Sequence, residues 1–342
     1  MVHNDFDKLI NIENIFRAWR VFKVGKEKKQ EVIFFERNIE DNLFLLHRDL
    51  STGNYRHLAY EFFRISDPKK RDIHKADIRD RIVHQIIYDY LSDSFEPIFI
   101  EYSYSSRVGK GSHLAVKQLQ IFSQDIAKRN FGRCYGAKLD VRKYFENIDH
   151  NILFDIICKN ICDERIRKII WEIIDSFHCK PSKSIPLGNI TSQIFANIYL
   201  NELDHFVAKK LKVRHYVRYN DDFVILDYNK ERMVEFARKA KIFVENKLLL
   251  KIPKEKITFR KLKWGIDFCG YIVLSDAILL RRKTKRRMLK NIFHTAERFE
   301  KGEIASRDFS KVFNSYCGLL KHCNSYNLKN KLISECLYET IY

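Results

Sequence analysis

The sequence predicts an α+β protein with a small sheet whose strands end or begin at aspartates. Three observations lead to this fold class. Short apolar runs typical of strands lie at 134–141, 213–219 and 223–228. Longer segments with apolar residues at helical spacing, such as 77–95 and 191–211, precede or separate them. With 342 residues, 45% of them hydrophobic, the chain can bury a large core, and we expect two or three subdomains.

The other elements follow in order along the chain. From 62 to 81 the chain is polar and basic, and Pro68 predicts a turn inside a β-turn-β element. A Gly-rich basic loop at 105–112 precedes a helix, and 184–188 predicts a turn before a long helix. We expect a boundary at 275–283, where the composition becomes basic and helical. Further helices are expected at 6–22, 38–50, 113–128, 149–177, 230–248 and 284–300, and short strands at 257–260 and 267–273.

The charge predicts a polyanionic partner. The formal net charge is +19, from 63 Lys and Arg against 44 Asp and Glu. Nucleic acid is the leading candidate, and a membrane surface or a merely solvated basic face are the alternatives. Tyr and Phe lie among the basic residues, which suits contacts to a phosphate backbone combined with base stacking. Because no uninterrupted apolar run of about 18 residues and no signal-peptide core occurs, we expect a soluble, cytoplasmic protein without membrane contact.

Cysteine spacing raises a zinc site as an alternative. Cys158 and Cys162 lie four residues apart in a helical pattern, with His178 and Cys179 downstream. No second CxxC pair supports such a site. We therefore interpret the cysteines as buried free thiols of a reducing compartment.

Acidic residues form the most informative local pattern. Asn220, Asp221 and Asp222 lie between two apolar strands, and adjacent carboxylates are stable there only when they are solvated or neutralised by cations. A solvated β-turn is the alternative. Asp140 ends another apolar strand, and a βαβ-like layout would bring the two strand ends together. Three converging carboxylates would suffice to bind two Mg²⁺ ions roughly 3.5–4 Å apart, the arrangement used in nucleotidyl transfer.

In order and spacing, these motifs resemble those of reverse transcriptases across most of the chain. Asp140 with Phe145 resembles the first palm motif, 219–222 resembles the YxDD motif, and 268–271 resembles the hairpin of the primer grip. The resemblance implies a right-hand polymerase fold whose fingers and palm combine an antiparallel sheet with helices. Its expected subdomains are fingers with N-terminal helices at 1–133, a palm at 134–276 with a helical insertion at about 150–183, and a small helical thumb at 277–342.

The resemblance also implies roles at the metal site. Asp140 and Asp221 would ligate both Mg²⁺ ions, or Mn²⁺ in their place, with a backbone carbonyl from Val141 and Asp222 as the weaker ligand. Phe145 lies where the family carries an aromatic steric gate that excludes a ribose 2′-hydroxyl, so dNTPs would be favoured over rNTPs. Core packing is the alternative role of this ring.

Other residues would contact the nucleotide and the nucleic acid. Arg71 resembles the fingers arginine that grips the triphosphate, with Lys69 and Lys70 as further candidates, although each could be a solvated charge. Leu187 and Gly188 would lie beside the incoming dNTP. Primer and template contacts are expected from Gly270, Tyr271, Arg107, Lys110, Arg281, Arg282, Arg286 and Arg287.

The segment 185–193 narrows the resemblance to one subclass. Group II intron and retroviral enzymes have Gln where this chain has Leu187 and usually Pro where it has Gln193, whereas enzymes of diversity-generating retroelements resemble this version. The segments 104–111 and 315–326 resemble theirs too. We expect Leu187 and Gln193 to affect fidelity. An aliphatic Leu187 cannot donate an amide hydrogen bond near the template base, so it should permit errors opposite adenine. Simple packing of Leu187 is the alternative.

This subclass implies partners and leaves alternatives. Its members act on a structured template RNA and a cDNA or DNA primer, usually with a small basic helical accessory protein that forms a pentameric barrel. The host would be a bacterium, an archaeon or a phage. The alternatives are a reverse transcriptase of another bacterial class (group II-like, retron or antiphage) and a non-catalytic RNA-binding protein built on an inactive palm. The intact Asp140, Asp221 and Asp222 argue against the last.

Overall fold

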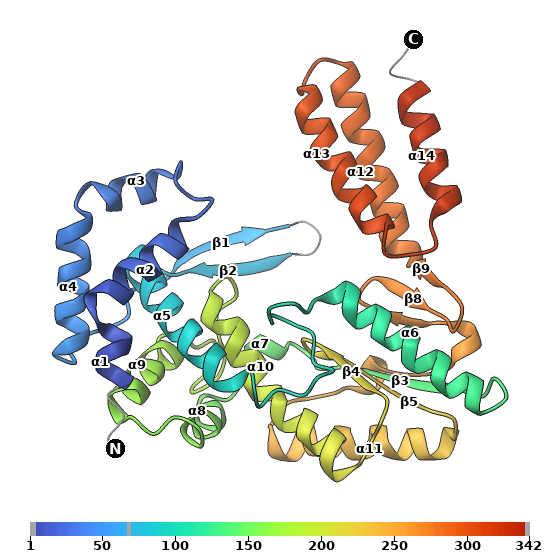
Figure 1. The fold of residues 1–342 in the computed structure, drawn as a ribbon, viewed down its shortest axis with the longest axis horizontal. Helices are drawn as coiled ribbons and strands as arrows, with labels where there is room; N and C mark the ends of the chain where they lie inside the picture. Colours follow the sequence, from blue (N-terminus) through green and yellow to red (C-terminus); the bar gives the residue numbers. More distant parts are fainter. Residues whose placement is uncertain (1–4, 67–69, 339–342) are drawn as a thin grey trace. The chain divides into compact units, whose positions relative to one another are not determined.

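A computed structural model describes residues 5–66 and 70–338. Its contacts divide the chain into two compact units, each assembled from separate stretches. Figure 1 labels the helices and strands. The first unit takes the described residues up to Glu101, then Val141–Phe206 and Ala240–Ile252. The second unit takes Tyr102–Asp140, Val207–Lys239 and the described residues from Pro253 onward. This division does not follow the boundaries predicted at 133 and 276, so the assignment of fingers, palm and thumb stays a prediction.

Helices dominate the first unit. They are α1 (Asp5–Ile10), α2 (Ile12–Lys23), α3 (Gln30–Arg37), α4 (Ile39–Ser51), α5 (Ile78–Phe95), α7 (Tyr144–Asn147), α8 (His150–Cys158), α9 (Glu164–Asp175) and α10 (Ile190–His205). α5 packs against α2 and α10, and α10 also packs against α8. α10 is buried on almost every face, so it forms the centre of this unit. The antiparallel hairpin of β1 (Glu61–Ile65) and β2 (Arg71–Lys75) also belongs here.

Capping side chains explain where helices begin within two predicted helical stretches. The helix predicted at 6–22 is interrupted at Asn11, whose side chain accepts a hydrogen bond from the Asn14 amide and so begins α2. The helical stretch predicted at 149–177 divides in the same way, because Asp163 caps α9. The helices predicted at 38–50 and 77–95 are confirmed within a residue as α4 and α5. The turn predicted at Pro68 lies outside the described residues.

An antiparallel sheet forms the centre of the second unit. Its strand order is β4 (Tyr216–Tyr219), β5 (Asp222–Asp227), β3 (Tyr135–Asp140) and β6 (Ile257–Lys261). β3 pairs antiparallel with both β5 and β6, so the βαβ-like layout expected from local patterns is wrong, whereas the antiparallel sheet that the resemblance implies is confirmed. Apolar side chains of α6 (Ser112–Arg129) share one buried cluster with Val217 of β4 and Val224 of β5.

A second, smaller sheet follows in the chain. β7 (Ile266–Phe268), β8 (Tyr271–Val273) and β9 (Ile278–Leu280) pair antiparallel. Cys269 and Gly270 both have positive φ and form the turn between β7 and β8. The hairpin that the resemblance implies at 268–271 is thus present, and the stretch predicted as a strand at 267–273 contains two short strands. β9 lies inside the predicted boundary at 275–283 and was not predicted as a strand.

Helices complete the second unit. α12 (Arg282–Glu300), α13 (Ser306–Leu320) and α14 (Tyr326–Tyr338) share a small core of Met288, Ile292, Leu320 and Leu332. The remaining elements are α11 (Lys230–Lys247), which contributes to both units, the π-helical turn η1 (Phe206–Lys210), and the 3₁₀ turns η2 (Lys254–Lys256) and η3 (Leu262–Trp264). None of the helices in the described part of the chain has the length and hydrophobicity needed to cross a bilayer.

The cysteines differ in part from the prediction. They are free within the described residues, but only some are buried: Cys134 is buried, whereas Cys162 and Cys179 are exposed. Across residues 5–66 and 70–338, no three His, Cys, Asp or Glu side chains are grouped closely enough to hold a metal ion. The alternative of a zinc site at Cys158 therefore gains no support.

Candidate active site

Two aspartates face each other across neighbouring strands of the larger sheet. Asp140, the last residue of β3, pairs in register with Asp222, the first residue of β5. Asp222 also pairs with Tyr219, so Asn220 and Asp221 form the turn between β4 and β5. Asn220 has a φ of 53°, in the left-handed region that asparagine tolerates better than most residues. The structure thus brings the three predicted aspartates to one end of the sheet.

Burial and mutual repulsion disfavour ionisation of this cluster. Burial raises the pKa of Asp221, and the nearby Asp140 carboxylate raises it further. Burial also raises the pKa of Asp222 to about 7, even though the Lys138 ammonium opposes the shift; Asp140 and Asp221 add repulsion. One oxygen of Asp222, Oδ1, is buried without a hydrogen-bond partner. The cluster therefore favours a proton or a cation beside these carboxylates.

Two lysines supply part of that positive charge. Lys256 Nζ lies 2.7 Å from Asp140 Oδ1, and Lys138 Nζ lies 3.3 Å from Asp222 Oδ2. The aspartates fit Mg²⁺, because this hard cation prefers carboxylate oxygens as ligands. A cation would also relieve the repulsion between the carboxylates and give Asp222 Oδ1 a partner. Among the described residues, these carboxylates are not grouped closely enough to hold a metal ion together. Val141, the predicted carbonyl ligand, begins a stretch of the first unit, so its role stays a prediction.

A buried arginine fixes the turn that carries Asp221. Arg218 of β4 is fully buried; its guanidinium donates to the Asn220 carbonyl at 3.1 Å and to Ser103 Oγ at 2.8 Å. The backbone amide of Tyr104 donates to the Arg218 carbonyl at 3.0 Å. Ser105 Oγ donates to the Asn220 side-chain carbonyl. The segment Ser103–Ser105 therefore supports the turn through side-chain and backbone bonds.

The same loop carries two predicted nucleic-acid contacts. Arg107 donates to the Ser103 carbonyl at 2.9 Å, which ties its side chain to the supporting segment. Lys110 Nζ lies 5.0 Å from the centre of the Tyr104 ring, a cation–π distance. Both contacts hold the basic side chains close to the loop that supports the turn carrying Asp221. Their contact with nucleic acid stays a prediction.

The predicted primer-grip residues form the tight turn between β7 and β8. Tyr271 is buried, and its hydroxyl lies 3.2 Å from His113 Nδ1 and 3.2 Å from the Leu319 carbonyl. Gly270 has a φ of 87°, which suits the turn. Burial raises the pKa of the Cys269 thiol, and the Asp222 charge raises it further, so the turn lies close to the acidic cluster.

The arginines in and just before α12 that are predicted to contact nucleic acid are mostly exposed. Arg281 precedes the helix and pairs with Asp267, with Arg281 Nη1 3.1 Å from Asp267 Oδ2. Arg282, Arg286 and Arg287 are exposed on α12. This exposed row of guanidinium groups can reach a polyanion, but the structure does not test that role.

Leu187 and Gly188 lie in the first unit. The Leu187 carbonyl accepts a hydrogen bond from the His74 amide at 3.0 Å, which joins this turn to β2. Gly188 has a φ of 113°, and a Cβ added there would lie 2.7 Å from Ile73 Cγ2. The backbone requires glycine at this position, and the Leu187 side chain is half-buried.

The other predicted nucleotide contacts also belong to the first unit. Phe145 in α7 is half-buried, and its ring meets Tyr144 edge-on with centroids 5.7 Å apart, which is consistent with a packing role beside any gating role. Gln193 is exposed on α10, and Arg71 is exposed at the start of β2. Lys69 lies outside the described residues. Their roles toward a dNTP stay predictions.

Sequence reasoning missed three cationic residues of the site. Lys138 lies two residues before Asp140, so both side chains are on the same face of β3; this spacing was a usable signal. Arg218 is a charge inside an apolar strand, a second signal, since a buried arginine requires partners. Lys256 is far from Asp140 in sequence and gave no signal before the pairing of β3 with β6 was known.

Comparisons of the sequence identify relatives. A family profile described as reverse transcriptase (RNA-dependent DNA polymerase) matches residues 67–273. The group II intron-encoded protein LtrA of Lactococcus lactis subsp. cremoris is 25% identical over 294 residues, covering 65% of this chain and 48% of LtrA. Protein YkfC of Escherichia coli K12 is 24% identical over 269 residues, covering 67% of this chain and 70% of YkfC. The chain thus spans about half the length of LtrA.

Solved structures agree in fold. Apo telomerase from Candida tropicalis, truncated from its C-terminal domain, aligns with a TM-score of 0.50 at 12% identity over 68% of this chain and 58% of that one. Apo telomerase from the same organism aligns with a TM-score of 0.51 at 12% identity, over 66% of this chain and 49% of the telomerase chain. At this identity the similarity concerns the fold alone, a mixed helix-and-sheet arrangement of the right-hand polymerase type. Because the matched profile covers more than half of the sequence, including β3, β4 and β5 with their aspartates, this chain belongs to the reverse transcriptase (RNA-dependent DNA polymerase) family.

Proposed function

We propose that the chain is an RNA-directed DNA polymerase that extends a primer by two-metal nucleotidyl transfer. The observation that carries this proposal is the pairing of Asp140 with Asp222 at the end of the sheet, with Asp221 in the adjoining turn. Membership of the family supports the same conclusion. The substrates are then dNTPs, a template RNA and a cDNA or DNA primer, and the net charge of +19 suits the nucleic acids.

The residues of the cluster would bind metal ions and balance the charge of the carboxylates. Asp140, Asp221 and Asp222, with the Val141 carbonyl, would hold Mg²⁺ or Mn²⁺. The bound ions would polarise the phosphoryl oxygen and activate the attacking 3′-hydroxyl. Lys138 keeps the carboxylates partly neutralised before the ions bind.

Residues outside the cluster would prepare the substrates. Arg218 holds the turn in place, so the carboxylates need little rearrangement. Phe145 would exclude the 2′-hydroxyl of an rNTP. Arg71 would grip the triphosphate, and the exposed arginines of α12 would contact the backbone of primer and template.

A primer-extension assay tests the function. The full chain is incubated with an RNA template, a DNA primer, dNTPs and Mg²⁺, and compared with the double variant Asp221→Asn/Asp222→Asn. Extension should fall below detection in the variant. Asp276→Asn is the matched control, because Asp276 is exposed in the connection between β8 and β9 and should be neutral. Extension that survives loss of both acids removes the catalytic proposal; wild type that binds RNA without extending it indicates an inactive palm.

We further propose an error-prone enzyme of a diversity-generating retroelement, acting with a small basic helical accessory protein. The support is Leu187, whose backbone is fixed by His74 while its side chain remains half-buried. A group II-like enzyme is the second candidate, favoured by the similarity to LtrA. Sequencing cDNA made from an adenine-rich RNA separates them. Leu187→Gln should reduce misincorporation opposite adenine, and unchanged fidelity would contradict the role of Leu187.

A further inference from the structure

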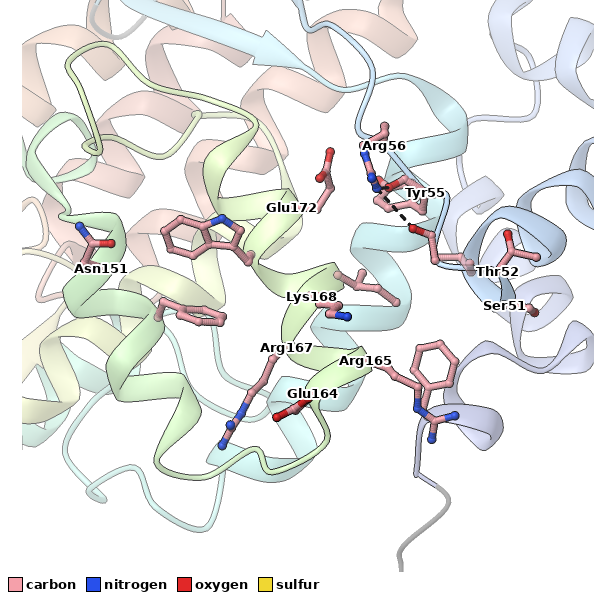
Figure 2. A pocket seen from close by; sticks show the side chains of 16 residues that line it. Ser51, Thr52, Tyr55, Arg56, Asn151, Glu164, Arg165, Arg167, Lys168 and Glu172 are labelled. Carbon is pink, nitrogen blue, oxygen red and sulfur yellow. Dashed lines mark hydrogen bonds between the residues drawn. The ribbon is translucent and has the colours of Figure 1, made fainter.

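A large cavity lies within the first unit. Its volume is about 1130 Å³, and the residues shown lining it come from α1, α4, the segment after α4, α8 and α9 (Figure 2). All of them belong to the first unit, whereas the aspartates of the candidate active site belong to the second. The volume exceeds the roughly 300–1,000 Å³ of ordinary small-molecule pockets, so a larger or longer ligand suits it better.

Aromatic rings line one side of this cavity. Phe154 of α8 and Trp171 of α9 meet edge to face, with ring centroids 4.9 Å apart. Both rings are half-buried, so each is held by packing and still presents a surface to the cavity. Leu50 and Ile169 extend the apolar lining. A packed aromatic ring that stays partly exposed is the feature on which a nucleobase stacks, at about 1–3 kcal/mol per base.

Three basic side chains of the lining keep their charge available. Arg56 donates to the carbonyls of Gly53 and Tyr55, and Arg167 donates to those of Ile161 and Cys158. Lys168 is exposed on α9. In the part of the chain that the structure describes, no carboxylate forms an ion pair with these three cations. An anion entering the cavity therefore need not displace a carboxylate from these side chains.

The other charged residues of the lining are one arginine in ion pairs and two glutamates. Arg165 pairs with Asp163 and Asp7, so its charge is already balanced. Glu172 accepts a hydrogen bond from the His57 amide at 2.9 Å, and Glu164 is exposed at the start of α9. The available cations outnumber these two carboxylates. The balance disfavours a cationic or purely apolar ligand.

We propose that this cavity is a second binding site, specific for single-stranded RNA. A base would stack on Trp171, and the flanking phosphates would contact Lys168, Arg56 and Arg167. Single strands are favoured because the rings lie in the cavity wall, where the paired and stacked bases of a duplex cannot reach them. The proposal rests on the proposed function for the presence of RNA, but binding here requires no catalysis.

Fluorescence anisotropy with a labelled single-stranded RNA tests the proposal. The full chain is first saturated with unlabelled primer–template duplex, so that the polymerase site does not contribute. Trp171→Leu keeps an apolar side chain and should weaken binding by roughly 5- to 150-fold, the loss of one stacked base. Lys168→Glu should weaken binding and reduce the salt slope by roughly 0.7, the loss of one phosphate contact. Lys159→Glu, an exposed lysine outside the lining, is the control.

The outcomes separate this proposal from the proposed function. Wild-type affinity in both Trp171→Leu and Lys168→Glu overturns the second site, whatever the extension assay shows. Equal competition by duplex RNA or by a poly-glutamate peptide overturns its specificity for single-stranded RNA. Lys168 is exposed, so its variant should keep the melting temperature and remains informative even if the Trp171 variant fails to fold. Cavity-dependent RNA binding by a chain that cannot extend a primer supports the second site and removes only the polymerase proposal.

Discussion

Asp222→Asn should stabilise the folded protein at high pH when no divalent metal is present. The pKa of Asp222 is raised by burial to about 7, against an ordinary value of 3.8. Between these values the folded chain keeps a proton that the unfolded chain has lost. The stabilisation is therefore complete below pH 3.8 and is lost as the pH rises through 7. The difference between the pKa values of 3.8 and about 7 corresponds to about 4 kcal/mol in free energy of unfolding. Asparagine avoids this loss because it carries no charge.

The attraction of Lys138 lowers the pKa of Asp222, so the value of about 7 already includes this ion pair. Asparagine gives up the contact with Lys138, whose Nζ is 3.3 Å from Asp222 Oδ2 and which is only partly exposed. At pH 8 we expect the variant to exceed wild type by about 1–4 kcal/mol in free energy of unfolding. By pH 5 the wild-type carboxyl is protonated in the folded state, so more than half of the advantage should disappear.

Urea unfolding in EDTA at pH 8 and at pH 5 measures this difference. Asp276→Asn, in an exposed connection, should show no such dependence on pH. Adding Mg²⁺ at pH 8 should stabilise wild type more than Asp222→Asn, because a cation relieves the same repulsion. A variant that is less stable than wild type at pH 8, or an advantage that does not change with pH, would refute the argument from burial.

Two further substitutions test how the turns are held. Arg218→Met removes charged hydrogen bonds to the Asn220 carbonyl and to Ser103 and should lower the free energy of unfolding by about 3 kcal/mol or more. Unfolding in urea at the wild-type midpoint would show that these bonds do not hold the turn. Gly188→Ala should cost about 1–3 kcal/mol, from a φ of 113° and from the approach to Ile73. Adding Ile73→Ala should restore only the part due to the clash, and full recovery would mean that the backbone is not strained.

Local patterns predicted most elements because their signals are local. The apolar spacing of 77–95 and the strand at 134–141 depend on side chains that are close in sequence, and both appear within a residue of the predicted bounds. The break at Asn11 was missed because a capping asparagine interrupts a pattern that otherwise continues. The strand pattern at 267–273 did not show where the chain turns, but the resemblance at 268–271 predicted the hairpin there, and Gly270 was a signal for its turn.

Pairing between distant strands could not be predicted from local patterns. The three aspartates were found from their positions at strand ends. The βαβ-like layout expected from local patterns was wrong, because strand direction depends on connections elsewhere in the chain, whereas the antiparallel sheet implied by the family resemblance was right. Lys256 entered the site only through the pairing of β6 with β3. The cavity beside Trp171 was missed for the same reason, since α4 and α9 are far apart in sequence.

The position of β3 inside the sheet has a consequence for synthesis on the ribosome. Its neighbours β5 and β6 are translated much later; Lys256, just before β6, follows Asp140 by 116 residues. Until both have emerged, the nascent chain presents β3 with unpaired backbone groups on its edges, which can associate with other chains. A ribosome that stalls before β6 would release an aggregation-prone fragment, and slow translation through this region would prolong the need for chaperones.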